Sequence, residues 1–356
     1  MSDRERAGLR GPVRTCVERT TFSNGTEFST TTEYSPDGKT LTFRNGNSDG
    51  SEWITTNTYD AEGRLVNTTS GKAGEPGVGK IYTYDNSGRR VSVTNSQNSD
   101  RTSFQYDELG HKTEILSFDP RTLEQNRNTA FAGSAWQGIL AGAGVPTGGT
   151  VAVLYDENDR PLEAQVRDGQ GNVLSRVVRT YEAKGRLSEE KVTWENPSAM
   201  LLDRLSPEAR SQMNPAEAAA LAKGMATLFN GRRESGTVYR YDRQDRIIST
   251  RETNSFFVKT TTVAYGDQGD KTEERTTFAD NAAIAIGVSY LVDAEGNLTP
   301  SEPAAGEPPR FPLPETSETR YSYQYDSFGN WTEQTATAGV GTAASSTVRR
   351  RTLTYY

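Results

Sequence analysis

The chain has 356 residues, which is enough for one large all-β unit or two ordinary domains. Its formal net charge is −7, and Lys and Arg are scattered among Asp and Glu, so the sequence excludes the clustered positive field of a nucleic-acid-binding surface. Cys16 and His111 are the only residues of their kinds, which excludes an intrachain disulfide and a cysteine or multi-histidine metal site.

One six-residue pattern recurs along the chain, and we call it the turn motif. It consists of Tyr, an acidic or small residue, two variable residues, Gly, and a basic or polar residue. The motifs begin at Tyr34, Tyr59, Tyr84, Tyr106, Tyr155, Tyr181, Tyr241, Tyr265, Val292 and Tyr325. The first three starts are 25 residues apart, and most later gaps are close to that value or its double. Such a period indicates a repeat architecture.

Each turn motif predicts a β-hairpin. The acidic residue accepts hydrogen bonds from backbone N–H groups ahead of it in a type I turn. The Gly, four residues after the Tyr, supplies the left-handed conformation that closes a three-residue loop with a bulge. Asp159 and Asp245 replace this Gly, and Asp tolerates the left-handed region better than most residues. This loop places Tyr59 opposite Leu65, Tyr181 opposite Leu187, Tyr241 opposite Ile247 and Tyr325 opposite Trp331.

The strands before the turns carry rows of aromatic residues, because side chains two apart in a strand share a face. Tyr beside Ser, Thr, Asn and Arg is typical of adaptable contact surfaces and suits sugars or peptides. The candidate binding residues are Tyr82, Tyr84, Tyr239, Tyr241, Tyr321, Tyr323, Tyr325 and Trp331. The alternative is that most of these side chains fill the inner face of the sheet.

The turn motifs resemble the YD or RHS repeats of bacterial wall-associated, toxin-complex and teneurin-like proteins, over about residues 15–115, 150–195 and 235–356. In that family, hairpins wind into a spiral sheet that can enclose a hollow shell. Large members hold a toxin inside and release it with a C-terminal aspartyl-protease module marked by Asp-Pro-x-Gly. Here the only Asp-Pro pair, at residues 119–120, is followed by Arg, so the resemblance implies a short member without that module.

For this chain, the resemblance implies an all-β fold as a single domain over residues 1–356. We expect antiparallel β-hairpin repeats in a curved, spiral or partly closed sheet, with a small helical insertion. Burial is expected mostly through Tyr and Thr, because Leu and Ile are few. Residues Val348–Tyr356 form the entry strand of a motif without its turn, so we expect them to be a final edge strand.

Three segments interrupt the repeat. Residues 120–150 are rich in Gly and Ala and are predicted to be a loop. Residues 198–230 are predicted to be an inserted helical hairpin, because Ser206 and Asn214 are N-cap residues and each is followed by Pro. This hairpin would cover one face of the sheet or dock a partner. Residues 300–318 are rich in Pro and Glu and are predicted to be a solvated loop.

The tyrosine rows and the resemblance favour a non-enzymatic repeat scaffold or binding module that recognises a carbohydrate or a protein partner. One alternative, from the resemblance alone, is an accessory or vestigial cage component of a bacterial toxin system. A second alternative is a hydrolase with two carboxylates about 5–9 Å apart. No spacing among the 47 acidic residues singles out such a pair. We therefore predict no catalytic residues, no metal and no cofactor.

The sequence also carries expectations about location. No apolar run approaches the roughly 18 residues of a membrane-spanning helix. The first ten residues have no apolar signal region. We therefore expect no membrane span and a cytoplasmic location by default, with the cell surface or export implied by the resemblance.

Overall fold

A computed structural model describes most of the chain. The described residues are 1–46, 50–97, 100–117, 149–195, 234–253, 257–280, 290–292, 298–300, 313–340 and 343–356. The helical hairpin predicted at 198–230 and nearly all of the Gly/Ala-rich loop predicted at 120–150 lie outside the described residues. So do residues 301–312 of the predicted Pro-rich loop and residues 293–297, which hold the turn of the Val292 motif.

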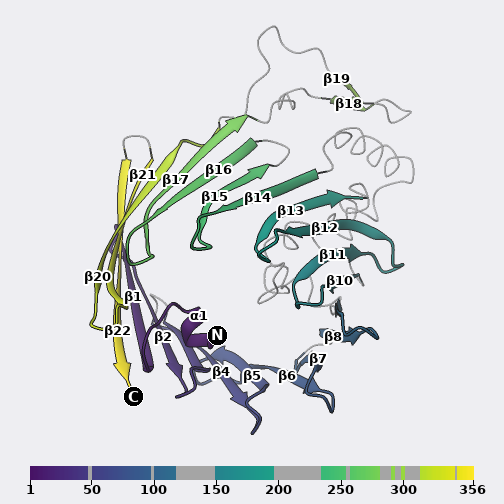
Figure 1. The fold of residues 1–356 in the computed structure, drawn as a ribbon, viewed down its shortest axis with the longest axis horizontal. Coiled ribbons are helices and arrows are strands. Elements are labelled where there is room, and N and C mark those ends of the chain that lie inside the picture. The colour runs from purple at the N-terminus through teal and green to yellow at the C-terminus, as the bar shows by residue number, and fades with distance from the viewer. Residues whose placement is uncertain are drawn as a thin grey trace. The chain divides into compact units, whose positions relative to one another are not determined.

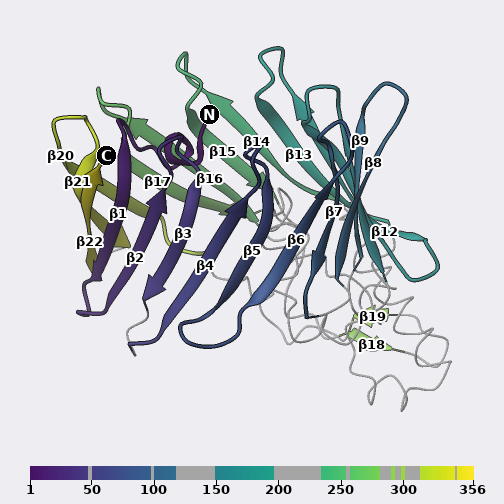
Figure 2. The same ribbon diagram turned by 90° about the horizontal axis from the view of Figure 1, so that it is seen from below.

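The first of two compact units consists of Met1–Gln97, Thr261–Thr277 and Glu315–Tyr356. Its strands pair antiparallel in one continuous run, and Figure 2 shows β1 to β6 of this run side by side. In hydrogen-bonded order they are β17 (Lys271–Asp280), β20 (Ser317–Tyr325), β21 (Trp331–Val340), β22 (Ala343–Tyr355), β1 (Val13–Phe22), β2 (Glu27–Tyr34), β3 (Thr40–Gly46), β4 (Glu52–Tyr59), β5 (Leu65–Lys72), β6 (Val78–Tyr84) and β7 (Arg90–Asn95).

The second compact unit consists of Asn98–Thr260 and Phe278–Pro314. It is also an antiparallel run of strands in chain order, coloured blue to green in Figure 1. These strands are β8 (Arg101–Tyr106), β9 (Lys112–Ser117), β10 (Thr150–Tyr155), β11 (Pro161–Arg167), β12 (Val173–Tyr181), β13 (Leu187–Trp194), β14 (Glu234–Tyr241) and β15 (Ile247–Thr253). β16 (Phe257–Tyr265) and the end of β17 cross the boundary between the units. β18 (Tyr290–Val292) pairs with β19 (Leu298–Pro300) in a separate sheet.

Twenty of the strands belong to one sheet, and the first and last of them are paired with each other. β1 pairs with β2 on one side and with β22 on the other, where Cys16 lies opposite Leu353. The final edge strand expected at Val348–Tyr356 therefore does not exist. The expectation of a curved, spiral or partly closed sheet is also wrong, because this pair closes the strand order. A hairpin pattern shows which strands follow each other, but it does not identify the partner of the first or the last strand.

The hairpins predicted from the turn motifs are confirmed. In the motif after β6, Asp85 N donates to the Arg89 carbonyl at 2.9 Å and Gly88 N donates to the Asp85 carbonyl at 2.9 Å. The same pair of bonds closes all nine motifs whose turns are described. The predicted opposite pairs, such as Tyr59 with Leu65, are present, and each lies at a register shift. Asp159 and Asp245 have φ values of 61° and 63°, as their replacement of Gly requires.

One further turn of this kind connects β11 to β12. Asp168 N donates to the Asn172 carbonyl at 3.0 Å, and Gly171 has a φ of 87°. It has the acidic residue, the Gly and a polar last residue, but no Tyr precedes it. Sequence reasoning based on the Tyr therefore missed it.

The buried side chains are mainly Val and Leu, not Tyr and Thr as the composition suggested. In the first compact unit a cluster is formed by Leu9, Val13, Cys16 and Tyr34, with Leu353 and Tyr355 packed against it. In the second unit the buried apolar residues are Leu116, Val151, Val153, Ala164, Val166, Leu174, Val177 and Val192. Strands β9 to β13 therefore hold most of the apolar burial found in the described residues.

A short helix, α1 (Asp3–Arg6), precedes the first strand and is the only helix in the described part of the chain. Glu5 N donates to Ser2 Oγ at 3.2 Å and Ser2 N donates to Glu5 Oε2 at 2.7 Å, which is a capping box. None of the helical residues that the structure describes forms a segment with the length and apolar character needed to cross a membrane.

Candidate functional site

The aromatic residues predicted to form a binding surface lie on four strands. Tyr82 and Tyr84 lie in β6, Tyr239 and Tyr241 in β14, Tyr321, Tyr323 and Tyr325 in β20, and Trp331 in β21. The β20–β21 residues are brought together: the Tyr323 and Tyr325 rings stack with centroids 5.9 Å apart, and Tyr325 lies opposite Trp331. The β14 pair belongs to the second compact unit and the other six residues belong to the first.

The tyrosine that begins a turn motif is fixed through its hydroxyl group. Tyr84 Oη donates to the Leu65 carbonyl at 2.7 Å, and Tyr241 Oη donates to the Leu187 carbonyl at 2.8 Å. In both cases the acceptor is the first residue after the preceding motif. Tyr59 and Tyr181 make the same bond, to Thr40 at 3.0 Å and to Pro161 at 2.8 Å. Each of these tyrosines therefore ties its hairpin to the preceding hairpin.

The ring of the same tyrosine lies beneath the basic residue of the preceding motif. The guanidinium carbon of Arg64 is 5.0 Å from the centroid of the Tyr84 ring, and that of Arg186 is 4.8 Å from the Tyr241 ring. Lys39 and Arg160 lie in the same way over Tyr59 and Tyr181. A cation over an aromatic face contributes about 0.5–1 kcal/mol at an exposed site. These contacts therefore favour a fixed stacking of one turn on the next.

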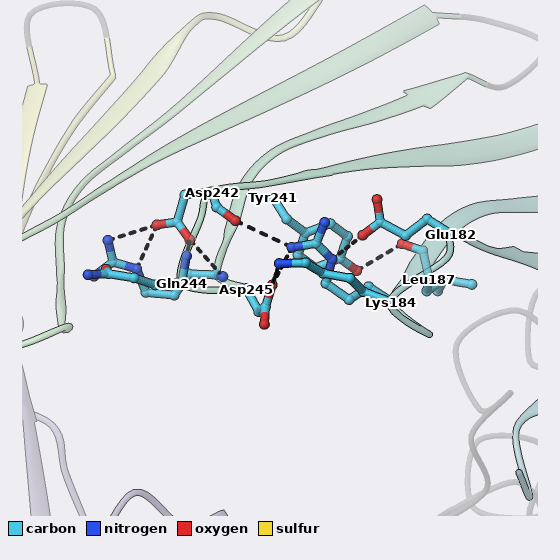
Figure 3. Close-up of polar contacts among 9 residues, drawn as sticks. Glu182, Lys184, Leu187, Tyr241, Asp242, Gln244 and Asp245 are labelled. Carbon is cyan, nitrogen blue, oxygen red and sulfur yellow. Dashed lines mark hydrogen bonds and ion pairs between the residues drawn. The ribbon is translucent and has the colours of Figure 1, made fainter.

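The basic residue is in turn held by the acidic residue of its own motif. Arg64 Nε donates to Asp60 Oδ2 at 2.7 Å, and Arg186 Nε donates to Glu182. Figure 3 shows this arrangement in the second compact unit, where Glu182 belongs to one turn and Tyr241 begins the next motif. We call the recurring set of acidic residue, basic residue and next tyrosine the tyrosine ladder.

The Gly of a motif lets the basic residue of the preceding motif approach closely. A Cβ atom at Gly185 would lie 2.7 Å from Arg160 Nη1, and one at Gly63 would lie 2.5 Å from Lys39 Nζ. Both glycines also have positive φ values, of 77° and 78°. The Gly therefore has two roles, because it forms the left-handed turn and leaves room for the neighbouring cation.

Where Asp replaces that Gly, an ion pair takes the place of the close approach. Asp245 pairs with Arg186 of the preceding motif, and Lys184 Nζ lies 3.4 Å from the same carboxylate, as Figure 3 shows. Asp159 pairs with Lys112 Nζ at 2.5 Å. In the two motifs that have Asp in place of Gly, an ion pair therefore maintains the contact between consecutive turns.

Hydrogen bonds within the turn lower the pKa of the turn Asp in several motifs, including Asp60, Asp85 and Asp242. The pKa of Asp85 is lowered to about 2, because the Ser87 hydroxyl and the Arg89 backbone N–H donate to the carboxylate and stabilise its charged form. In the opposite sense, burial and a hydrogen bond to Asp270 raise the pKa of Tyr325 to about 12. These shifts are explained by contacts within and between turns.

The expectation of a carbohydrate-binding module is wrong. A sugar ring needs an open aromatic face, but the guanidinium carbon of Arg351 lies 3.6 Å from the centroid of the Trp331 ring. That of Arg90 lies 5.1 Å from the Tyr82 ring. Cations therefore lie over one face of four of the eight candidate residues, Tyr82, Tyr84, Tyr241 and Trp331. The tyrosines are part of the architecture of the sheet.

The buried carboxylates are held by ion pairs. Asp156 and Glu190 are the buried carboxylates among the described residues. Each is paired with an arginine: Asp156 with Arg160 at 2.6 Å, and Glu190 with Arg179 at 2.6 Å. Within the same residues, no group of three or more His, Cys, Asp or Glu could hold a metal ion. The absence of an activity and of a cofactor stays a prediction.

A group of exposed aromatic side chains that sequence reasoning missed lies on β1 to β4. The ring centroids of Phe22 and Phe28 are 5.7 Å apart at the β1–β2 hairpin. The register places Phe28, Phe43 and Trp53 on the same face of the sheet. Their exposed fractions are 40%, 39%, 38% and 48% in chain order. We call these four residues the aromatic patch.

A signal for the patch exists in the sequence. Phe28 and Trp53 each stand six residues before the tyrosine of their motif, Tyr34 and Tyr59. This spacing puts them at equivalent places on equivalent strands. The tyrosine rows near the turns do not extend to these positions.

Comparison with known proteins finds likeness at the level of solved structures alone. No family model matches the chain, and no curated protein matches it. A porin-like protein from Bacteroides uniformis is 10% identical, with 97% of this chain and 98% of that chain covered and a TM-score of 0.35. The structures of TcdB2-TccC3-TEV and TcdB2-TccC3-Cdc42 are 11% and 12% identical, with TM-scores of 0.19 and 0.18. Each of these two matches covers 87% of the present chain and 21% of the chain in the solved structure.

These TM-scores are too low to carry an argument about function or compartment. The description as a YD or RHS repeat is corrected to a closed antiparallel sheet with turn motifs. The compartment stays a prediction.

Proposed function

We propose that this chain is a non-enzymatic scaffold that binds a protein partner through the aromatic patch. The observation that carries the proposal is the exposure of Phe22, Phe28, Phe43 and Trp53 on one face of four consecutive strands. Aromatic residues are enriched at the centres of protein interfaces, where they supply most of the binding energy. Exposed apolar side chains gathered on one face of a sheet are typical of an interaction site.

The tyrosine ladder supports the scaffold part of the proposal. It commits acidic, basic and phenolic side chains to contacts between consecutive turns, as for Asp60, Arg64 and Tyr84. Side chains that hold one another in this way position the strands. They leave the face of β1 to β4 that carries the patch as a surface presented by a fixed framework.

The test is capture of a partner by cross-linking, followed by calorimetry with the purified partner. The bait proteins are the native chain, a double variant with Phe43→Ser and Trp53→Ser, and a control with Ile81→Ser. Ile81 is 48% exposed, as is Trp53, but it lies on the opposite face of the same compact unit. We expect the double variant to bind at least tenfold more weakly, since central aromatic residues of an interface commonly cost about 2 kcal/mol or more each.

The control variant should bind as the native chain does, and circular dichroism should show that all three proteins are folded. A partner that binds the native chain and the double variant equally would contradict the proposal. So would the absence of any captured protein with the folded native chain as bait.

A further inference from the structure

Two stretches of chain that are far apart in sequence meet where β1 pairs with β22. Tyr356 N donates to the Pro12 carbonyl at 3.0 Å. Val13 lies opposite Tyr355. Gly11, which comes two residues before Val13, has a φ of 73°. These features give the start of β1 and the end of β22 the geometry of a turn.

A complete turn motif has the same three features. After β6, Asp85 N donates to the Arg89 carbonyl at 2.9 Å, Arg90 lies opposite Tyr84, and Gly88 has a φ of 81°. In both places the residue after the tyrosine donates to the residue after the glycine. In a complete motif, a two-residue tip connects the residue after the tyrosine to the glycine. β22 and β1 have no such connection.

We propose that residues 10–13 and 355–356 form a split turn motif that acts as a noncovalent latch. The sheet opens at this latch more readily than at a complete hairpin. A complete hairpin keeps its strands close through its short loop, so separated strands meet again at little entropic cost. β1 and β22 have no such loop. Their separation would also leave two unpaired strand edges, so the latch controls whether these edges are covered.

The preceding turn, between β20 and β21, holds both halves of the latch through Asn330. Arg10 N donates to Asn330 Oδ1 at 2.6 Å, and Asn330 Nδ2 donates to the Arg10 carbonyl at 3.0 Å. Asn330 Nδ2 also lies 3.0 Å from the hydroxyl of Tyr355, whose ring stacks on Phe328 with centroids 4.6 Å apart. Asn330 is 1% exposed, so these bonds are shielded from water.

Cys16 reports on the latch because it lies in β1, opposite Leu353 of β22. It is the only cysteine of the chain and is 8% exposed, within the cluster that includes Leu9 and Tyr355. A thiol reagent can reach it when β22 moves away from β1. Its labelling rate therefore measures how often the latch is open.

The test compares Asn330→Ala with Asn172→Ala by the rate at which dithiobis(nitrobenzoate) labels Cys16 in the full chain. Both asparagines end an acidic turn, and each donates through Nδ2 to the acidic residue of its own turn, at 3.3 Å from Asp326 and 2.9 Å from Asp168. Only Asn330 also contacts the latch. We expect at least tenfold faster labelling in Asn330→Ala, as the loss of its three shielded hydrogen bonds to Arg10 and Tyr355 implies, and the native rate in Asn172→Ala.

Labelling is repeated in low concentrations of urea to distinguish latch opening from global unfolding. A local opening exposes little surface, so its rate changes little with urea, whereas global unfolding responds steeply. Tyr356→Phe, which removes the hydroxyl that donates to the Tyr34 carbonyl, should accelerate labelling by a smaller factor. Equal rates in the native chain and Asn330→Ala would overturn the proposal. An acceleration that follows the urea dependence of global unfolding would do the same.

Discussion

At the scale of single residues, the acidic residue of the turn motif links the local turn to the ladder. Asp85 accepts from the backbone of Ser87 and Arg89 and from the Ser87 hydroxyl, and it also holds the Arg89 side chain at 2.9 Å. All of these contacts favour the ionised carboxylate. The charge state of Asp85 should therefore control how well this turn is formed.

Because the pKa of Asp85 is lowered in the folded protein, we expect the protein to lose stability in acid. Asp85's folded-state pKa of about 2 lies below the value of about 3.9 for an unfolded chain, so its contribution is present above about pH 4 and is lost as the pH falls towards 2. Asp85→Asn should melt at a lower temperature than the native protein at pH 7, and the two curves should converge near pH 2. Thermal melts from pH 7 to pH 2 measure this.

Ser87→Ala serves as the intermediate case, because it removes the strongest of the bonds that lower the pKa of Asp85. Because the unfolded-state pKa of Asp85 is unchanged, the fall in the melting temperature of this variant should begin at the same pH as in the native protein, but it should be smaller and end at a higher pH. A difference between native and Asp85→Asn that is constant from pH 7 to pH 2 would show that the carboxylate charge is not involved.

Sequence reasoning predicted the conformation of the residues at the Gly position but not their contacts. The left-handed conformation of Asp245 follows from its place in the motif. Its ion pair with Arg186 does not, because 59 residues separate the two and the pattern does not fix the distance between consecutive turns. For the same reason, the tyrosines were interpreted as a binding surface, although their hydroxyl groups and rings are used between hairpins.

At the scale of the element, replacing turn glycines by Ala can distinguish two causes of strain: the left-handed backbone and the close approach of a neighbouring side chain. Gly110 has a φ of 85°, and a Cβ atom added there would have no neighbouring atom within 4 Å, whereas at Gly185 a Cβ would lie 2.7 Å from Arg160. Gly110→Ala should lower the free energy of unfolding by about 1–2 kcal/mol, through the left-handed conformation alone. Gly185→Ala should cost more, because it also moves Arg160 away from the Tyr181 ring.

Urea denaturation of the two variants gives both free energies, and both glycines lie in the second compact unit. Equal losses would mean that Arg160 can move without cost. In that case its contact with the Tyr181 ring would not contribute to the stability of the ladder.

Hairpins and their register could be predicted, whereas sheet closure could not. Residue spacing within one motif determines which residue lies opposite its tyrosine, as for Tyr241 and Ile247. The pairing of β1 with β22 joins residues such as Glu18 and Arg351, which no local pattern connects. The aromatic patch lay between these cases, because its spacing is visible in the sequence but its exposure depends on which strands are neighbours.

At the scale of the whole molecule, stability should be uneven, because strands in a repeat contact mainly their neighbours. The charged and aromatic contacts of the ladder recur in both compact units. Apolar burial is less even: Val151, Val166 and Val177 of the second unit are fully buried, whereas β2 to β7 of the first unit have Tyr34 as their one buried hydrophobic side chain. The strands β10 to β13 should therefore be the last to open.

Val166→Ala tests this distribution. Val166 is 0% exposed in β11, so losing two methyl groups should lower the free energy of unfolding by about 2 kcal/mol. Val238→Ala is the matched control, because Val238 is 42% exposed on β14 of the same unit and should change the free energy by less than about 0.5 kcal/mol. Hydrogen exchange should also show the slowest amide exchange in β10 to β13 of the native chain. Faster exchange there than in β2 to β7 would mean that the ladder, and not apolar burial, determines which strands open last.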